Sequence, residues 1–185
     1  MDVNIKDVFI DFFSKHNKMT FGKMFFRLYN PVEDSIIMNY TTEEWNMIFR
    51  ETAEEDLKEL HGCANVVILL WCDTLTNMPH GMLYLQDSYP TPGVVSFHGG
   101  TWDHQPVFFH EIFRSLFYMF RFLFNYCSTI TTTCGLDNNH ADKFQRSFGF
   151  IETYQDNNTS YKVLYKEQFE KSIIASRQRI AVFNR

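Results

Sequence analysis

Cysteines are few in this sequence, and their spacing argues against two classes of protein. The four are too sparse for the disulfide scaffold of a small secreted domain and form no Cys-x-x-Cys pair: Cys63, Cys72, Cys127 and Cys134. We therefore expect buried thiols in a reducing compartment. The first residues mix charged with apolar side chains, unlike the uninterrupted apolar stretch of a signal peptide. A cytoplasmic protein is the resulting prediction.

The sequence also lacks an unbroken apolar run and an excess of basic residues. Its longest apolar segment, residues 107–126, is interrupted by four side chains that are costly in a bilayer: His110, Glu111, Arg114 and Arg121. The formal net charge is -5, whereas binding to a nucleic-acid backbone depends on accumulated Lys and Arg. Neither a membrane-spanning helix nor a nucleic-acid partner is predicted.

The chain has enough apolar material for one hydrophobic core. It holds 185 residues, of which 45% are hydrophobic and 21% charged, and it shows no internal repeat or low-complexity linker. We expect a single domain over residues 1–185. In the tail at 167–185 basic residues alternate with apolar ones, which favours a docked helix or a self-association element over a nucleic-acid arm and leaves a homodimer open.

The spacing of apolar residues predicts helices and strands in alternation. The expected elements are a helix at 3–16, a strand at 23–30, a helix at 41–62, strands at 65–73, 81–87 and 93–98, a long helix from Pro106, a strand from Ser128, a short helix with Ala141, Phe144 and Phe148 facing inward, and a hairpin of strands at 151–155 and 160–165. Gly99-Gly100 and a polar loop at 101–105 separate the 93–98 strand from the long helix. This order predicts an α/β (α+β) fold with a mixed, mostly antiparallel central sheet flanked by helices.

Residues 128–150 carry the most specific pattern: a β-branched strand, an Asn that can cap the next helix, and a Gly-Phe stop. This passage resembles the C-terminal motif of the GCN5-related N-acetyltransferase (GNAT) superfamily, with Asn138, Ala141, Gly149 and Phe150 at the matching positions. The order of elements over residues 23–166 is similar to the GNAT fold as well. The resemblance implies a GNAT-like sheet in which the fourth and fifth strands splay apart.

The resemblance also implies a reaction, the transfer of an acetyl group from acetyl-coenzyme A to a small-molecule or peptide amine. It implies that main-chain groups of Ser96, Phe97 and His98 contact the pantetheine chain, and that Asn138 lies beside the cofactor arm. The diphosphate would bind at the start of the long helix, where free N–H groups favour anions. The residues implied there are Gln105, Val107, Phe108 and Phe109.

The chain departs from the family pattern in two motifs, the diphosphate loop and the proton donor. If Gln105 opens the diphosphate loop Gln/Arg-x-x-Gly-x-Gly/Ala, then Phe108 and His110 stand where small residues belong. The Tyr that commonly protonates the departing thiolate falls on Gln145, whose amide cannot supply that proton at neutral pH. These departures motivate an alternative function, a catalytically degraded GNAT-fold module for binding or assembly.

His98 is the predicted general base, because it ends a strand beside the expected thioester and an imidazole titrates near neutrality. A structural loop histidine is the alternative interpretation, and Asp73 and Tyr84 are further candidates for the base. His98 also belongs to a trio of equally spaced histidines, with His104 and His110, which suggests a zinc enzyme. That trio matches no established metal-binding spacing, so no metal is predicted. The sequence does not identify the acceptor amine.

Overall fold

The computed structural model describes residues 3–34, 59–88, 91–101, 109–172 and 174–175. Its elements in chain order are α1 (Ile5–Lys15), β1 (Met19–Phe21), β2 (Met24–Leu28), β3 (Val66–Asp73), β4 (Pro79–Asp87), β5 (Val94–Thr101), α4 (Phe109–Leu123), β6 (Thr129–Gly135), α5 (Asn139–Ser147), β7 (Ile151–Gln155), β8 (Thr159–Tyr165) and α6 (Lys166–Lys171). The amphipathic helix and the closing hairpin predicted from the sequence are therefore confirmed, and each other predicted strand is present, some of them with different bounds.

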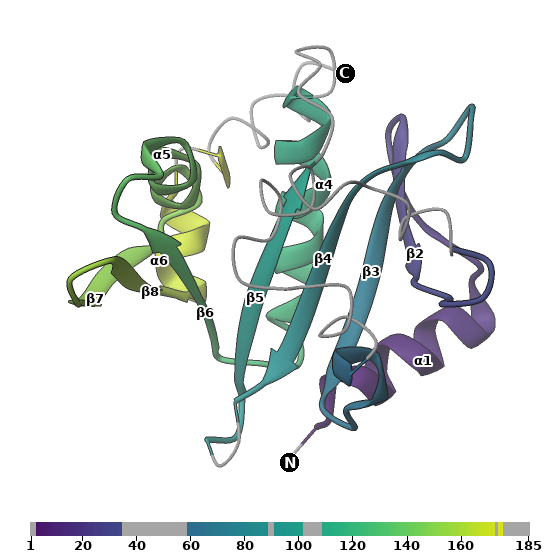
Figure 1. Cartoon of the computed structure of the whole chain (residues 1–185), viewed down its shortest axis with the longest axis horizontal. Helices are drawn as coiled ribbons and strands as arrows, with labels where there is room; N and C mark the ends of the chain where they lie inside the picture. Colours follow the sequence, from purple (N-terminus) through teal and green to yellow (C-terminus); the bar gives the residue numbers. More distant parts are fainter. Residues whose placement is uncertain (1–2, 35–58, 89–90, 102–108, 173, 176–185) are drawn as a thin grey trace.

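These strands form one eight-stranded sheet in the order β1-β2-β3-β4-β5-β6-β8-β7 (Figure 1). Neighbouring strands are antiparallel except β5 and β6, which run parallel. The helix α4 connects these two, because parallel neighbours need a long crossover. The predicted mixed, mostly antiparallel sheet flanked by helices is confirmed.

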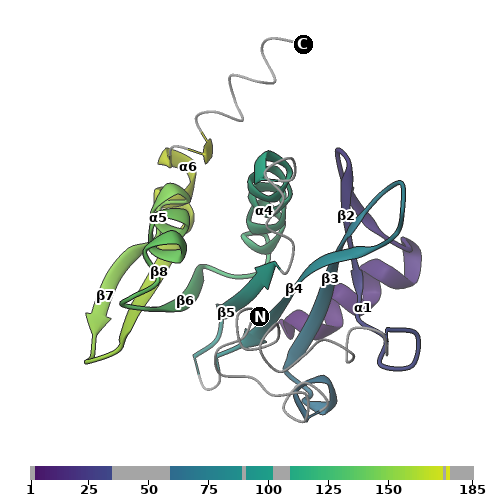
Figure 2. The ribbon, with the colours of Figure 1, turned by 45° about the horizontal axis from the view of Figure 1, so that its top comes forward.

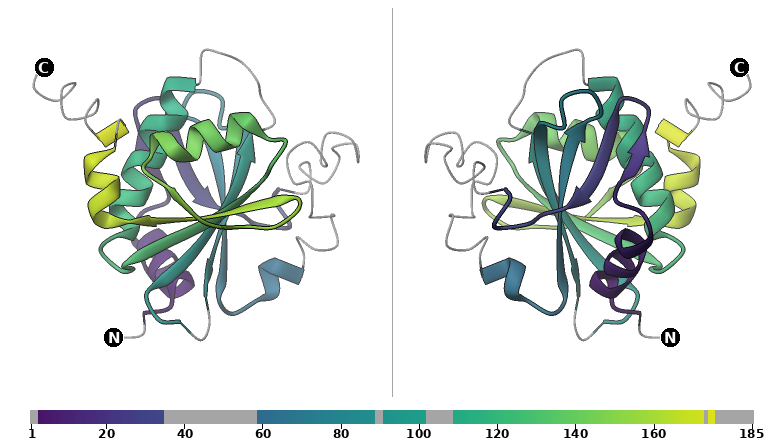
Figure 3. Two further views of the ribbon diagram at one scale, coloured as in Figure 1. Left: turned by 90° about the vertical axis from the view of Figure 1, so that its left-hand side faces the viewer. Right: turned by 90° about the vertical axis from the view of Figure 1, so that its right-hand side faces the viewer.

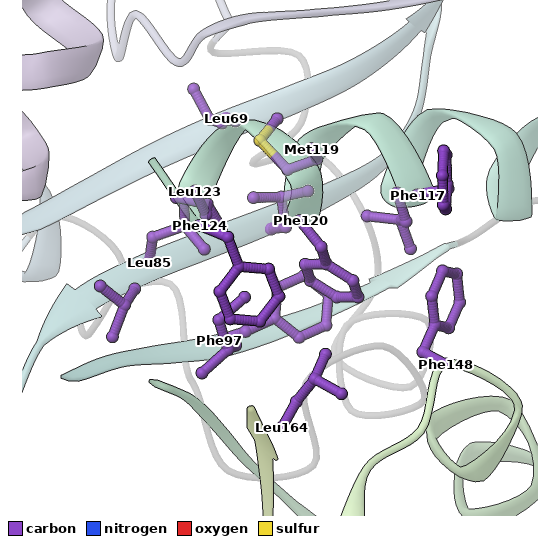
Figure 4. Close-up of a cluster of buried hydrophobic side chains, with 14 of the residues drawn as sticks. Leu69, Leu85, Phe97, Phe117, Met119, Phe120, Leu123, Phe124, Phe148 and Leu164 are labelled. Atoms are coloured by element: carbon purple, nitrogen blue, oxygen red, sulfur yellow. The ribbon is translucent and has the colours of Figure 1, made fainter. Parts of the chain in front are cut away.

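The helices α1, α4 and α6 lie on one face of the sheet, and the helical turn at residues 59–62 lies on the other (Figure 3). Side chains of α4 meet those of β4, β5, β8 and α5 in the main core (Figure 4). Because side chains alternate along a strand, Leu85 and Phe97 face this core, whereas Tyr84 and His98 face the opposite side.

The opposite side of the sheet has a smaller apolar cluster of its own. Its buried members come mainly from β2 and β3 and include Phe25, Tyr29, Ile68, Leu70 and Met82. Leu60 and Cys63 pack against it from the helical turn and the residue that follows it. Strand β3 is buried along its whole length because it is covered on both faces.

The helix α5 begins and ends at the residues that the sequence motif indicates. The side chain of Asn138 caps it, with Oδ1 accepting a hydrogen bond from the Ala141 N–H at 3.0 Å. Gly149 follows the helix at a φ of 95°, which returns the chain so that Phe150 is buried. Of the predicted inward positions, Phe148 is buried and Ala141 and Phe144 are half-buried.

Two strand predictions need correction. The strand expected at 23–30 is the shorter β2, and β1 precedes it in a hairpin that turns at Gly22, where φ is 63°. The strand expected at 93–98 does not end at His98, because β5 continues through Gly99 and Gly100 to Thr101. The end was placed too early because β4 offers a pairing partner to each of these residues, a contact that the local sequence does not reveal.

Other predictions fall partly outside the described residues. Only residues 59–62 of the helix expected at 41–62 are described, and they are helical. The expected start of the long helix at Pro106 lies outside, and α4 ends at Leu123, before Tyr126. In the described part of the chain, no helix has the length and apolar character needed to span a membrane.

Candidate active site

The parallel strands β5 and β6 pair over only three residues. Their register matches Val94 with Thr129 and ends where Ser96 meets Thr131. Beyond that point β5 continues beside β4, and β6 continues beside β8, so the two strands diverge (Figure 2). The splayed pair implied by the resemblance is therefore present between β5 and β6.

The direction of the hydrogen bonds shows which main-chain groups of β5 face β6. Val94 O accepts from Ser88 N at 3.0 Å on the β4 side, whereas Gly93 O accepts from Thr129 N at 3.2 Å on the β6 side. Main-chain groups alternate in direction along a strand, so Phe97 and Gly99 face the β6 side. We call this part of the strand, residues 97–101, the free edge of β5, because no strand of the described chain pairs with it on that side.

This alternation changes the predicted set of main-chain contacts. Phe97 directs its N–H and C=O along the free edge, as the prediction requires. The same groups of Ser96 and His98 are directed at β4, with which both residues pair. Gly99 takes their place on the free edge, and sequence reasoning missed it because the strand was expected to end at His98. A glycine inside a strand is itself a signal of close backbone approach.

At Gly99 there is no room for a side chain between β5 and β4. A Cβ atom at this position would lie 2.9 Å from Leu83 Cβ, closer than real Cβ atoms approach, and 3.0 Å from Met82 O. The pair of Gly99 with Leu83 is a non-hydrogen-bonded pair, the narrower kind in an antiparallel ladder. A larger residue here would push β5 away from β4 and displace the free edge.

His98 stacks on its cross-strand neighbour Tyr84, with ring centroids 4.7 Å apart and planes 13° from parallel. Burial lowers the pKa of His98 below its usual 6.5, because the protonated ring loses hydration. The imidazole is therefore neutral at neutral pH, the form in which it can accept a proton. Asp73 lies elsewhere, at the end of β3, where its carboxylate accepts hydrogen bonds from the N–H groups of Leu75 and Thr76 in the following turn.

Ser96 marks the point where β5 and β6 part. Its hydroxyl lies 2.9 Å from Thr131 Oγ1 and 3.2 Å from Ser88 Oγ. These contacts fasten the end of the parallel pairing through side chains. Asn138, at the far end of β6, is engaged in capping α5 and is half-buried.

A buried polar cluster joins α5 to β6 and β8. The Nζ of Lys162 lies 2.7 Å from Asp142 Oδ1, 2.8 Å from Gln145 Oε1 and 3.0 Å from Cys134 Sγ. The lysine side chain is completely buried. Sequence reasoning missed it, although the alternation of Ser160, Lys162 and Leu164 along β8 places a lysine on the inward face.

The predicted diphosphate residues lie mostly outside the described part of the chain. Gln105, Val107 and Phe108 fall in the undescribed stretch, as does His104, one of the three histidines considered for zinc. Phe109 begins α4, and His110 is exposed on it. Where side chains are described, no three His, Cys, Asp or Glu residues are grouped as a metal ion would require.

Comparisons with known proteins are informative only at the level of structure. No protein-family model matches the sequence, and no curated protein matches it. The chain is similar to a crystal structure of a GCN5-related N-acetyltransferase from Brucella melitensis, with a TM-score of 0.67 and 13% identity over 87% of this chain and 84% of that one. It is also similar to apo FdhC, a nucleotide-linked sugar GNAT, with a TM-score of 0.66 and 11% identity over 86% of this chain and 96% of that one.

A third similar structure contains ligands. It is the aminoglycoside acetyltransferase AAC(6')-Ib in complex with coenzyme A and kanamycin, with a TM-score of 0.62 and 14% identity over 80% of this chain and 98% of that one. At these identities the likeness concerns the fold, and the chemistry of the present chain has to be argued from its own residues.

Proposed function

The chain has the GNAT fold, and from this premise we propose that it is an acyltransferase that moves the acetyl group of acetyl-coenzyme A to an amine. The amine nitrogen attacks the thioester carbonyl, the carbon–sulfur bond breaks, and the electron pair leaves with sulfur as the coenzyme A thiolate. The attacking nitrogen loses a proton in the same sequence. The products are an amide and free coenzyme A.

The observation that carries the proposal is the free edge of β5. Phe97 and Gly99 direct main-chain N–H and C=O groups along it, and these groups suit the amides of a pantetheine chain lying beside the strand. A ligand that pairs in this way extends the sheet, so its orientation is fixed by backbone alone. The thioester then lies between β5 and β6, next to the side chains at the edge of β6.

His98 is the proposed general base. It lies on β5 next to the free edge, and its lowered pKa keeps the ring neutral. A neutral ring can take the proton that the attacking amine releases, and stacking on Tyr84 fixes its plane. The diphosphate would bind at the N-terminus of α4, as the sequence predicts for Gln105 and residues 107–109.

Calorimetric titration with acetyl-coenzyme A, followed by detection of released thiol in the presence of a panel of amines, tests the proposal. We expect saturable binding and amine-dependent thiol release. The variant His98→Phe keeps an aromatic ring against Tyr84, so it should bind the donor normally and release thiol at least about 100-fold more slowly. Normal turnover by His98→Phe would show that His98 is not the general base. If the parent protein does not bind acetyl-coenzyme A, the proposed acyltransferase activity is refuted.

A binding or assembly module without transferase activity is the second candidate function, and the residue that favours it is Gln145. This residue stands where the resemblance implies a proton-donating Tyr, and an amide does not give up its proton at neutral pH. The variant Phe108→Ala separates the two functions further. If only this variant binds acetyl-coenzyme A, then the bulky loop residue closes the donor site and the module is the better description.

A further inference from the structure

Lys162 is a cation that the fold has removed completely from water. It sits on β8 beneath α5, and its side chain has 0% exposure. Burying an ammonium group is costly unless it is paired and hydrogen-bonded, and replacing such a group with an apolar one often stabilises a protein. A stabilising role alone is therefore a weak reason for a lysine at this position.

The ammonium group determines how the Gln145 amide is oriented. A protonated lysine has three N–H donors and no acceptor, so the amide atom 2.8 Å from its Nζ must be the oxygen. Asp142 and Cys134 accept the remaining two hydrogen bonds. With Oε1 held by Lys162, the Nε2 end of Gln145 has to point away from the lysine.

The Nε2 group points to the edge of β6 that faces β5. It donates to Thr133 O at 3.1 Å, and Thr133 directs its main chain toward β5, as Thr129 does through its bond to Gly93. The second Nε2 hydrogen lies toward Thr132 Oγ1 at 3.4 Å, at the long limit of a hydrogen bond. This weakly held N–H is available to a stronger acceptor next to β6.

Lys162 shares its counter-ion with a second cation. Asp142 is shared with Arg146, whose Nε lies 2.8 Å from the second carboxylate oxygen. Both cations hold the pKa of Asp142 below its usual range, Arg146 more strongly. Glu152 faces Arg146 from β7, on the exposed side of the cluster, where solvent screens its charge.

We propose that Lys162 is a positioning residue for acyl transfer: it locks Gln145 so that the Nε2–H donates a hydrogen bond to the coenzyme A sulfur as that sulfur becomes a thiolate. The inference rests on the proposed function. The carbon–sulfur bond breaks with both electrons on sulfur, and Gln145 keeps its proton. The ammonium polarises the amide and makes its N–H a better donor to an anion.

The thiol of bound coenzyme A reports this interaction directly, without any acceptor amine. Ultraviolet absorbance of the thiolate gives its fraction as a function of pH, with desulfo-coenzyme A bound to the same protein as the baseline. We expect bound coenzyme A to hold about tenfold more thiolate than free coenzyme A below the thiol pKa. Lys162→Met should remove most of this excess, and Lys171→Met, at an exposed lysine paired with Glu167, should leave it unchanged.

A second variant separates three possible roles of Lys162: positioning of Gln145, direct electrostatic attraction of the thiolate, and stabilisation of the fold. Gln145→Leu leaves the pair of Lys162 with Asp142 intact and should also abolish the excess of thiolate. Adding Lys162→Met to it should have no further effect, because the lysine acts through the amide. A purely structural lysine would lower the unfolding midpoint and leave the thiol titration unchanged.

Three results would overturn the inference. These are bound coenzyme A that titrates like free coenzyme A, a Lys162→Met variant that keeps the excess of thiolate, and effects of the two substitutions that add. If Lys162→Met does not fold, the test rests on the Gln145→Leu variant. Coenzyme A bound to that variant would contradict the inference if it kept the excess of thiolate. Failure to bind coenzyme A at all would refute the proposed function itself, and the inference with it.

Discussion

Gly99→Ala tests whether the close contact between β4 and β5 sets the position of the free edge. The added Cβ would lie 2.9 Å from Leu83 Cβ and 3.0 Å from Met82 O. Neither of these atoms is the far end of a flexible side chain, so the backbone has to move to relieve the steric clash. The register continues on both sides of Gly99, from Tyr84 with His98 to Met82 with Gly100, and it resists that movement.

The expected cost follows from two opposing effects. Forcing an extra methyl group into a packed site costs about 1–3 kcal/mol. Replacing a glycine within a strand returns about 0.5–1 kcal/mol, because alanine loses less conformational freedom on folding. The net expectation is a destabilisation of about 1–2 kcal/mol. A displaced free edge should also weaken binding of coenzyme A, since Phe97 and residue 99 would no longer lie in register with the donor amides.

Urea unfolding measures the first effect and calorimetry with coenzyme A the second. Gly62→Ala is the matched control, because a Cβ at Gly62 meets nothing within 4 Å. Gly62 lies in a helical turn, where alanine should raise stability by up to about 1 kcal/mol. If Gly99→Ala proves as stable as the parent while Gly62→Ala behaves as expected, the backbone contact does not constrain β5 and the reasoning fails.

Three further predictions concern named contacts. The pKa of His98 is lowered in the folded state, so the unfolded chain binds a proton on this imidazole more tightly than the folded chain does. The free energy of unfolding should therefore fall as the pH drops below about 6.5. Urea unfolding of His98→Phe should show a smaller fall between about pH 7.5 and 5.5. Ser115→Ala should cost about 1–3 kcal/mol, since it leaves the buried Trp71 indole N–H without the acceptor at 2.9 Å, and adding Trp71→Phe should recover part of that loss. Gly149→Ala should lower the thermal midpoint by roughly 5 °C or more, because φ is 95° and the new Cβ would lie 2.7 Å from Gln168 O; an unchanged midpoint would show that the helix end relaxes freely.

Local sequence was sufficient to predict the parts of the fold that depend on local interactions. Asn138 as a helix cap and Gly149 as a helix stop act through backbone groups only a few residues away, so the motif alone indicates them. The hairpin of β7 and β8 is likewise local. Gly99 was left outside the predicted strand because a glycine that ends a strand and a glycine packed against a neighbouring strand look alike until the partner, Leu83, is known.

The candidate site was harder to predict because its chemistry comes from residues that meet only in the folded sheet. His98 could be singled out as an imidazole at a strand end. Its stacking on Tyr84, and the burial that lowers its pKa, depend on β4. Lys162 and Gln145 are 17 residues apart in the sequence and meet because α5 folds back over β8. No spacing rule connects a helix residue to a strand residue across such a distance.

The separation of β5 and β6 is held by the core rather than by the strands. Phe120 of α4 is fully buried, with its ring centroid 5.0 Å from that of Phe97 on β5 and 5.2 Å from that of Phe148 beside α5. One ring thus contacts the half of the sheet that carries the free edge and the half that carries Gln145. Since packed aromatic rings cannot interpenetrate, this contact keeps the two halves apart where pairing between the strands has ended. The distance between Phe97 and Gln145, where the proposed function places the thioester, is therefore set by the hydrophobic core.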